Sequence, residues 1–405
     1  YTTDNETLQI FKQGNYNTNE GPDFLNAKIY INNICWVGPI EIHVFASDWL
    51  KHNHQKDKNY DMVILHVVWE EDKIIKDKYG NNLPTLILKP LVSPILLQKY
   101  VDLMNKNKSI IPCHHLLFKF EIIKWVSWKE RLLVERLERK SSVILEKLKI
   151  NNNDWEKTTW TLIAQQLAGP LNSIVFEQIL DNVPFSIFQK NKNNIQIIES
   201  ILFGQSNLLS PNYIDEYPKK LWKDYNFYLK KYNLKKQHIE VKFMRMRPAS
   251  FPTIRLSQLA RLICTQDNIF SVIKECPSYL VLKQLFNIET AVYWHTHYVF
   301  DNAQKKTPSF IGEDVINRII INAVSPILFA IGVYFNDINF KAKSIHLLEK
   351  IFPENNVITR KWTKDMVNMD SAWDSQAIIE LNNQYCNYRK CLSCAVGVEI
   401  LKKTN

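Results

Sequence analysis

The sequence predicts an α+β fold, with a small mixed-sheet α/β domain at residues 1–110 and a large all-helical, basic domain at residues 111–405. Three observations lead to this prediction. Segments of strand length and strand periodicity fill the first part, and helical periodicity replaces them in the second. The charge divides at the same place: residues 1–110 carry twelve Lys, no Arg and thirteen acidic residues, and the rest carries 39 basic and 28 acidic residues.

The first part begins with a predicted β-hairpin. Residues 24–31 alternate between apolar and polar side chains, Asn32-Asn33 is a two-residue turn signal, and residues 34–45 alternate again. Gly38-Pro39 interrupts the second strand and predicts a β-bulge there. The alternation places five apolar residues on one face of the second strand: Ile34, Trp36, Ile40, Ile42 and Val44.

A short helix and two more strands complete this domain. Ser47 is a helix N-cap residue, which predicts a helix over residues 48–58. Residues 62–69 form an apolar run typical of a central strand, and residues 83–88 predict another strand.

Beyond residue 120 the apolar residues recur at helical spacing. We expect helices at 121–148, 158–168, 171–181, 195–203, 220–232, 254–265, 314–333 and 371–384.

Composition excludes some classes and favours others. The sequence contains no run of about 18 apolar residues, so it predicts no membrane-spanning helix. It has nine glycines, and they form neither a GxGxxG motif nor a Walker-type nucleotide-binding loop. The net charge of +10 favours a polyanion partner such as DNA or RNA, although a solvated Lys-rich surface gives the same count. Seven Cys, an odd number in a long chain, argue against a disulfide framework and favour a cytoplasmic protein. Because Tyr1 is not an initiator Met, we expect the natural chain to begin upstream.

The densest chemistry lies in the predicted hairpin. Glu41 and His43 share one strand face because they are two residues apart. With a bulge at Gly38-Pro39, Asp23 would lie opposite His43, and Glu41 would be diagonal to both. These three residues are the predicted catalytic group. Two carboxylates suit Mg²⁺ or Mn²⁺, and an imidazole shifts the preference towards Mn²⁺ or Zn²⁺.

The predicted helix adds more potential metal ligands. His52, His54 and Asp57 extend the metal site, with Asp48 and His52 four residues apart on one helix face. A polar helix surface is the alternative for these residues. His66 lies inside the apolar strand and is predicted to be a hydrogen-bonded core histidine.

This arrangement resembles the PD-(D/E)xK nuclease superfamily, which has a restriction-endonuclease-like core. Pro22-Asp23 and Glu41-Ile42-His43 match its two motif strands, followed by the helix and the next strand. His43 stands where that superfamily has Lys, so the resemblance implies either a base or metal ligand at this position or a core without catalysis.

A second resemblance spans most of the chain. Several blocks are similar to those of an uncharacterised bacterial family, a domain of unknown function. They are GPDFLNAKI (21–29), EIHVFASDWLKHNHQKDKNYDMVILHVV (41–68), ILFGQSNLL (201–209), RPASFPTIRLSQLA (247–260) and YCNYRKCLSCAVG (385–397).

A Cys cluster lies near the C-terminus. Cys386, Cys391 and Cys394 have the spacing C-x4-C-x2-C, which suits zinc or an iron–sulfur cluster. Cys113 is the predicted fourth ligand. Reduced structural thiols are the alternative.

Arginines of the second part are candidates for phosphate contacts, because a guanidinium matches a phosphate well. They are Arg245, Arg247, Arg255 and Arg261. Ion pairs with acidic helices are the alternative. The motif His295-Thr296-His297 is a weak metal signal.

These observations predict a metal-dependent nuclease. The alternatives are a non-catalytic nucleic-acid- or ribosome-associated protein on a degenerate nuclease core, and a metal-dependent hydrolase of small substrates.

Overall fold

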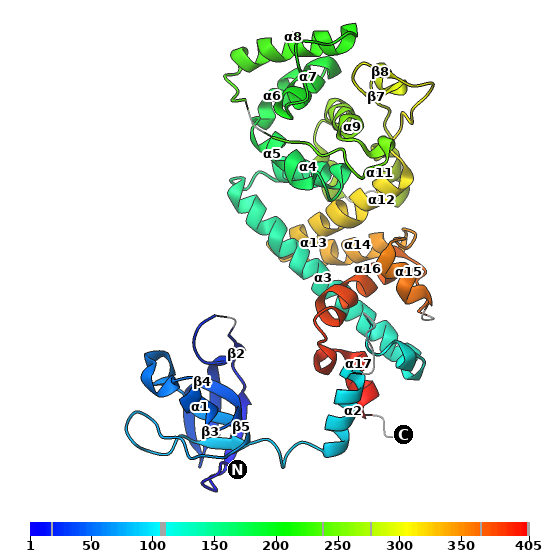
Figure 1. Ribbon diagram of the computed structural model, residues 1–405. Helices are drawn as coiled ribbons and strands as arrows, with labels where there is room; N and C mark the ends of the chain where they lie inside the picture. Colours follow the sequence, from blue (N-terminus) through cyan, green and yellow to red (C-terminus); the bar gives the residue numbers. More distant parts are fainter. Residues whose placement is uncertain (18, 106–110, 237–238, 276–277, 365–366, 403–405) are drawn as a thin grey trace. The chain divides into compact units, whose positions relative to one another are not determined.

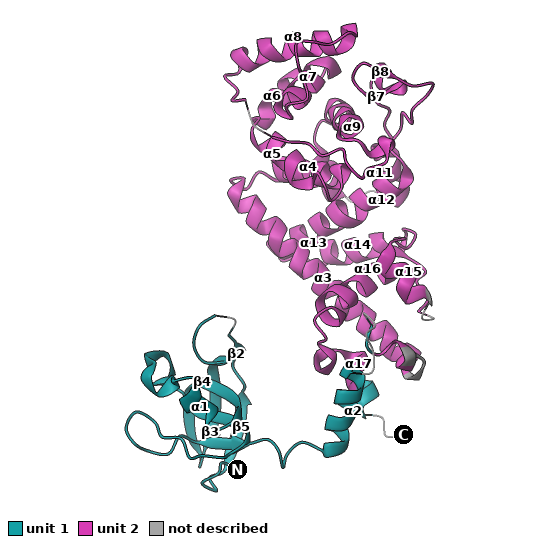
Figure 2. Cartoon of the chain, viewed as in Figure 1, with its two compact units in different colours: residues 1–112, 399–405 teal, residues 113–398 magenta. Residues whose placement is uncertain are grey.

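The chain divides into two compact units (Figures 1 and 2). Unit 1 contains Tyr1–Pro112 and Glu399–Asn405, and unit 2 contains Cys113–Val398. The computed structural model describes residues 1–17, 19–105, 111–236, 239–275, 278–364 and 367–402. Unit 1 holds a mixed β-sheet and unit 2 is mainly helical, so the predicted α+β fold is confirmed.

Unit 1 is built on one mixed sheet with the order β1-β3-β4-β5-β6, and β2 pairs with β3 at one end. Neighbouring strands are antiparallel from β1 to β4, whereas β5 is parallel to β4 and β6 is parallel to β5. The strands are β1 (Leu8–Lys12), β2 (Asn15–Tyr16), β3 (Phe24–Ile31), β4 (Ile34–Phe45), β5 (Leu65–Glu70) and β6 (Thr85–Ile87).

The hairpin turn between β3 and β4 lies where the sequence predicts it. Ile31 pairs with Ile34 across the turn. Asn32 and Asn33 both have positive φ, 47° and 67°, as the central residues of a type I′ turn require. This part of the register is therefore confirmed.

The bulge predicted at Gly38-Pro39 is wrong. The register shifts between Phe24 and Ala27 on the other strand, where Asn26 takes a left-handed conformation with φ 57°. Asn tolerates this conformation better than other residues with a side chain, so it can hold the extra residue of β3. Gly38 serves close packing instead: a Cβ there would lie 2.6 Å from Cγ2 of Ile64.

The predicted helix at 48–58 is shorter than expected. Helix α1 (Asp48–Lys51) is followed by two 3₁₀ turns, His54–Lys56 and Lys58–Tyr60. Asn53 stops the helix because it is left-handed, with φ 60°. Helix α1 packs against β4 (Figure 1) and buries Trp49. Unit 1 also contains α2 (Pro94–Asn105).

Two apolar clusters form the core of unit 1, one on each side of the sheet. The cluster on the α1 side contains Ala46, Trp49, Val63, Val68, Ile75 and Leu83. The other contains Ala27, Ile29, Ile31, Ile40, Ile64, Leu65, Val67 and Leu86.

In unit 2 the long helix α3 (Ile122–Ile150) packs against α13 and α16. Arg139 donates two hydrogen bonds to Glu380, of 3.0 and 2.6 Å, and joins α3 to α16. The other helices are α4 (Trp155–Ala168), α5 (Ser173–Asp181), α6 (Phe185–Asn191), α7 (Ile195–Gln205), α8 (Glu216–Lys231), α9 (Pro252–Thr265), α10 (Ile269–Glu275), α11 (Tyr279–Phe286), α12 (Glu313–Ile319), α13 (Ser325–Tyr334), α14 (Ile338–Glu349), α15 (Val357–Lys364) and α16 (Ala372–Glu380). Helix α17 (Ala395–Lys402) begins in unit 2 and ends in the C-terminal segment of unit 1. A small hairpin consists of β7 (His297–Val299) and β8 (Asn302–Ala303).

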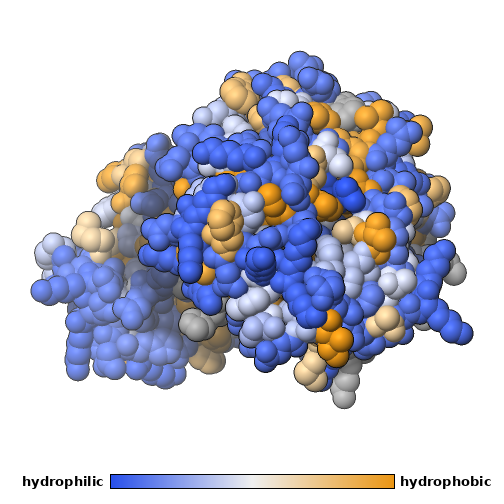
Figure 3. All heavy atoms as spheres, turned by 90° about the horizontal axis from the view of Figure 1, so that it is seen from above, coloured by the Kyte–Doolittle hydropathy of each residue, from blue (hydrophilic) through white to orange (hydrophobic). Residues whose placement is uncertain are grey.

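Among the described residues of unit 2, one helical segment is long and apolar enough to cross a membrane. It is Glu313–Tyr334, which contains α12, the π-helical turn Ile320–Val324 and α13. Within its most apolar window, 78% is buried inside the protein, as in the core helix of a soluble protein. The face of the molecule in Figure 3 is largely hydrophilic, with hydrophobic residues scattered singly or in small groups.

Candidate metal centre

Glu41 and His43 lie on the inward face of β4. Their side chains point towards α1, and only 5% of Glu41 and 9% of His43 is exposed. Ile42 and Val44 are 41% and 57% exposed. These two apolar residues lie on the opposite face of β4, because the polar face is the one covered by α1 and the turns that follow.

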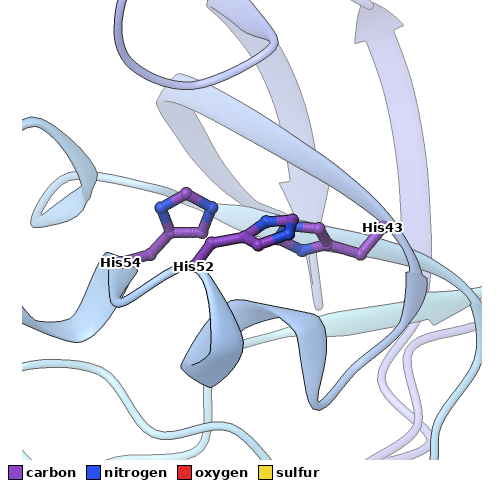
Figure 4. A group of neighbouring side chains, drawn as sticks. All are labelled: His43, His52 and His54. Atoms are coloured by element: carbon purple, nitrogen blue, oxygen red, sulfur yellow. The ribbon is translucent and has the colours of Figure 1, made fainter.

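The turn after α1 brings two more imidazoles to this face. His52 is the C-cap of α1, and His54 begins the next 3₁₀ turn. Asn53 between them is left-handed and reverses the chain. Asp48 anchors the start of α1, because its Oδ2 accepts a hydrogen bond of 3.0 Å from the backbone N–H of Phe45. Figure 4 shows the rings of His52 and His43 next to each other, with His54 beside them.

The distances between these groups suit a metal ion. His43 Nε2 lies 3.2 Å from His52 Nδ1 and 3.5 Å from Glu41 Oε1, and His54 Nε2 lies 3.3 Å from the same Glu41 oxygen. One nitrogen of each of the three imidazoles lies within 4.8 Å of the other two. Zn–N bonds of about 2.0–2.1 Å place neighbouring ligands of a tetrahedral ion about 3.3–3.4 Å apart. The 3.2 Å between the His43 and His52 nitrogens is close to this length, and the other imidazole pairs lie within 4.8 Å.

A shell of buried groups surrounds the imidazoles. His66 lies opposite Glu41 in the parallel β4–β5 register, and its Nε2 is 2.9 Å from His43 Nδ1. Tyr60 stacks on His54 with ring centroids 3.8 Å apart. Trp49 contacts His43 edge-on, at 6.5 Å between ring centroids. These contacts hold the rings in place, as outer groups do around metal ligands.

Burial sets the protonation states of this cluster. It lowers the pKa of His43 to about 4, assisted by the positive charges that His54 and His52 would carry. It lowers the pKa of His66 to about 3, and it also lowers that of His54. His43, His54 and His66 are therefore neutral near pH 7, which is the form that binds metals. Burial raises the pKa of Glu41 to about 7, and the negative charge of Asp23 adds to this effect.

Asp23 and Asp57, the two aspartates of the predicted metal site, do not join the imidazoles. Asp23 positions Glu41: its backbone N–H donates to Glu41 Oε2 at 3.0 Å, while its own Oδ2 accepts from the N–H of Ile42 at 3.0 Å. Asp57 is exposed and caps a 3₁₀ turn by accepting from the N–H of Asn59 at 2.9 Å. The structure therefore groups Glu41, His43, His52 and His54 and leaves the Asp57 carboxylate in a turn.

Sequence reasoning missed the roles of His66, Trp49 and Tyr60. His66 reads as a core residue because it lies in an apolar strand, and only the parallel pairing with β4 places it behind His43. The aromatic residues carried no signal, since aromatic side chains in apolar segments are ordinary core residues.

The predicted arginines occupy different environments. Arg245 and Arg247 are exposed in the loop before α9. Arg255 is 5% exposed and donates to Gln258 Oε1 at 2.7 Å. Arg261 donates to the backbone oxygen of Glu289 at 3.1 Å. As placed, the first two are available to a phosphate, whereas the guanidinium of Arg255 is enclosed.

The His295-Thr296-His297 motif lies in and beside the small hairpin of unit 2. His297 stacks on Tyr293 with ring centroids 4.0 Å apart, and its Nε2 lies 3.4 Å from Asp215 Oδ2. His295 lies 3.4 Å from Glu289. The two imidazoles thus pair with different carboxylates.

The four predicted Cys ligands are all buried and all lie in unit 2. Cys113 is the first residue of this unit, and Cys386, Cys391 and Cys394 lie near its end.

Comparison with known proteins gives a family and no activity. No curated protein and no solved structure matches the chain significantly. A family described as "Protein of unknown function (DUF2851)" matches residues 1–357, which include the whole candidate metal centre. The chain belongs to this DUF2851 family.

Proposed function

We propose that unit 1 is a metal-dependent hydrolase that cleaves phosphodiester bonds of nucleic acids. The observation that carries this proposal is the convergence of His43, His52 and His54 beside Glu41. Three imidazoles are a set of ligands typical of catalytic zinc sites, in which a fourth position stays open, and the Glu41 carboxylate lies beside them.

The chemistry of the ligands favours zinc or manganese over magnesium. Imidazole nitrogen suits zinc and related ions, whereas magnesium takes oxygen ligands. Because burial keeps His43 and His54 neutral near pH 7, an ion displaces no proton from these two imidazoles on binding. A bound ion would supply a Lewis acid for the scissile phosphate and lower the pKa of water.

Glu41 is the best placed general base. Its Oε1 lies 3.5 Å from His43 and 3.3 Å from His54, and its Oε2 is held by the backbone N–H of Asp23. One carboxylate oxygen is thus fixed while the other faces the imidazoles. A pKa of about 7 in the metal-free protein lies close to the value that suits proton transfer at neutral pH.

Three features support a nucleic acid as the substrate. The antiparallel strands β1, β3 and β4, followed by α1 and the parallel strand β5, have the order that the resemblance to the PD-(D/E)xK superfamily implies. Pro22-Asp23 directly precedes β3, and Glu41-Ile42-His43 lies in β4. The chain carries 51 basic against 41 acidic residues, and Arg245 and Arg247 are exposed. We expect this activity in the cytoplasm, where thiols stay reduced.

The second candidate is a nucleic-acid- or ribosome-associated protein that binds without cleaving. The presence of His43 at the position of the superfamily's Lys favours it. In that case the buried imidazoles would be a structural site and the basic surface would do the binding.

The full chain, stripped of metal and reloaded with Zn²⁺, Mn²⁺ or Mg²⁺, tests the proposal. Labelled single- and double-stranded DNA and RNA are the substrates, and His52→Ala and Glu41→Gln are the variants. His346→Ala is the matched control, because His346 is exposed in unit 2 and contacts Glu349. We expect cleavage with Zn²⁺ or Mn²⁺, its loss in both site variants, and wild-type activity in the control.

Other results would change the conclusion. Tight, salt-sensitive binding without cleavage under any metal would refute the hydrolase and support the binding protein. Metal at the site without affinity for nucleic acid would instead support a hydrolase of small substrates.

A further inference from the structure

Helix α8 carries a strong positive charge on the surface of unit 2. Residues 216–236, which contain α8 and the turn after it, include seven lysines and two acidic residues. One face of α8 packs on α7 (Figure 1) and buries Pro218, Leu221 and Tyr225. Gly204 of α7 permits this close approach, because a Cβ there would overlap the Tyr225 ring. The opposite face, which carries the lysines, is left to solvent.

The acidic residues of this segment leave most of its positive charge uncompensated. Glu216 pairs with Lys219 at 2.8 Å, and Asp224 accepts a hydrogen bond from Gln196 of α7. No carboxylate of the described residues forms an ion pair with the six other lysines, all of which are exposed: Lys220, Lys223, Lys230, Lys231, Lys235 and Lys236. The surface therefore attracts a polyanion.

Aromatic rings lie among these lysines. Lys231 Nζ lies 5.9, 5.4 and 5.3 Å from the ring centroids of Phe227, Tyr228 and Tyr232. The rings of Tyr228 and Tyr232 are nearly parallel, with 15° between their planes. Phe227 is 60% exposed, although it is one of the large apolar residues that a helix usually buries. The outer face of α8 thus combines cations with an accessible aromatic ring.

Helical spacing places this ring in line with the lysines. Each of Lys220, Lys223, Phe227 and Lys231 is three or four residues from the next, so together they form one stripe, the lysine–aromatic stripe. The stripe is about 16 Å long, at 1.5 Å of helix per residue. A positively charged track with aromatic rings beside it is typical of surfaces that bind single strands, where phosphates contact the cations and bases stack on the rings.

We propose that the lysine–aromatic stripe of α8 binds single-stranded nucleic acid, with phosphates on its lysines and a base stacked on Phe227. This inference rests on the proposed function, in which a nucleic acid is the substrate, and it adds the surface that holds the strand. A duplex fits the stripe less well, because neighbouring base pairs cover the faces of its bases. A membrane also fits less well, because among the described residues of α8 only Phe227 is a large exposed hydrophobic residue.

Fluorescence anisotropy of labelled single-stranded DNA and RNA measures binding to the full chain without metal, so that no cleavage intervenes. Phe227→Leu should weaken binding by about 5- to 100-fold, because leucine is apolar but does not stack on a base. It should leave the salt dependence unchanged. Lys220→Gln combined with Lys223→Gln should reduce the slope of log affinity against log salt concentration by about 1.4, since each contact with a single strand contributes about 0.7.

Phe335→Leu and Lys274→Gln are the matched controls. Phe335 is 54% exposed, and Lys274 Nζ lies 5.5 Å from its ring centroid, so this pair repeats the chemistry of the stripe at another place in unit 2. Both controls should bind single strands as tightly as the wild type. All the substituted side chains are exposed, so the variants should keep the thermal unfolding of the wild type.

Two comparisons separate this inference from the hydrolase of unit 1. His52→Ala should keep the binding of single strands, and the zinc-loaded α8 variants should keep any cleavage of the small phosphodiester bis(4-nitrophenyl) phosphate. Binding that depends on α8, without cleavage by the wild type, would support the stripe and refute the hydrolase. Equal affinity of Phe227→Leu and the wild type, an unchanged salt slope in the double lysine variant, or stronger binding to phosphatidylserine vesicles than to single strands would overturn the inference.

Discussion

His66→Leu tests whether the imidazoles of unit 1 form a metal site with an outer shell. His66 is fully buried, and its Nε2 lies 2.9 Å from His43 Nδ1. The opposite nitrogen of His43, Nε2, is the one that faces Glu41 and His52. His66 therefore fixes which nitrogen of His43 carries the proton and which one is free for a metal. Leucine fills a similar volume but accepts no hydrogen bond.

The expected losses of zinc affinity and of stability in His66→Leu follow from the contact between His66 and His43. Loss of an outer hydrogen-bond partner typically weakens metal affinity by about 10- to 100-fold, or roughly 1.4–2.7 kcal/mol. In the metal-free protein, the unpaired N–H of His43 costs about 1–3 kcal/mol. The substitution also has a favourable effect on stability. Within the described residues the buried His66 Nδ1 has no hydrogen-bond partner, and leucine removes this unpaired polar group. We therefore expect a larger loss in zinc affinity than in the stability of the metal-free protein.

Zinc affinity is measured by competition with a chromophoric chelator, and stability by urea unfolding of the metal-free protein. His346→Leu, at an exposed position, is the control. A folded His66→Leu variant that binds zinc as tightly as the wild type would show that His66 is an ordinary core residue and would refute the reasoning.

Three other predictions address Glu41, the His52–His54 turn and the packing of α17. The raised pKa of Glu41, about 7 against an ordinary value of 4.5, means that the unfolded chain ionises first, so this carboxyl lowers the stability of the metal-free protein increasingly as pH rises from 4.5 to 7. Glu41→Gln should therefore raise the free energy of unfolding by about 1–3 kcal/mol at pH 8 and by little at pH 4.5. Urea unfolding at the two pH values measures this, and a variant that is less stable than the wild type at pH 8 would contradict the prediction. Asn53→Val should strain the left-handed turn and weaken zinc binding, whereas Asn53→Gly should keep it; equal affinities in the chelator assay would exclude a role for the turn. Gly397→Ala should destabilise the chain by about 1–3 kcal/mol, because a Cβ there would lie 2.2 Å from the Cys391 oxygen, whereas Gly312→Ala, where a Cβ meets nothing within 4 Å, should leave the thermal unfolding of the chain unchanged.

Local patterns were sufficient for most of the fold. Alternation and the Asn32-Asn33 turn predicted the hairpin, and helical periodicity predicted the helical part. The errors came from residues that periodicity does not describe. Asn26 placed the bulge on β3, and Asn53 ended α1 after one turn. Asn at a left-handed position looks the same in sequence as Asn on a polar surface.

Part of the candidate site could also be predicted from the sequence. The density of His and carboxylate residues predicted a site that contains Glu41, His43, His52 and His54, and it also included Asp23 and Asp57. Which face of β4 is buried could not be deduced, because Ile42 and Val44 are as apolar as core residues and yet are exposed. The position of His66 depends on a parallel pairing between strands that are distant in sequence, and no local pattern encodes that register.

The burial of the imidazole cluster has a consequence for the rate of metal exchange. Glu41 and His43 are almost enclosed, and of the three imidazoles only that of His52 belongs to an exposed residue. An ion held there would leave only when the turn at His52 opens, so its dissociation would be limited by local unfolding of that turn. The protein would then keep its ion through brief exposure to chelators. The ion present when unit 1 folds, rather than the ion most abundant later, would determine which metal the protein carries.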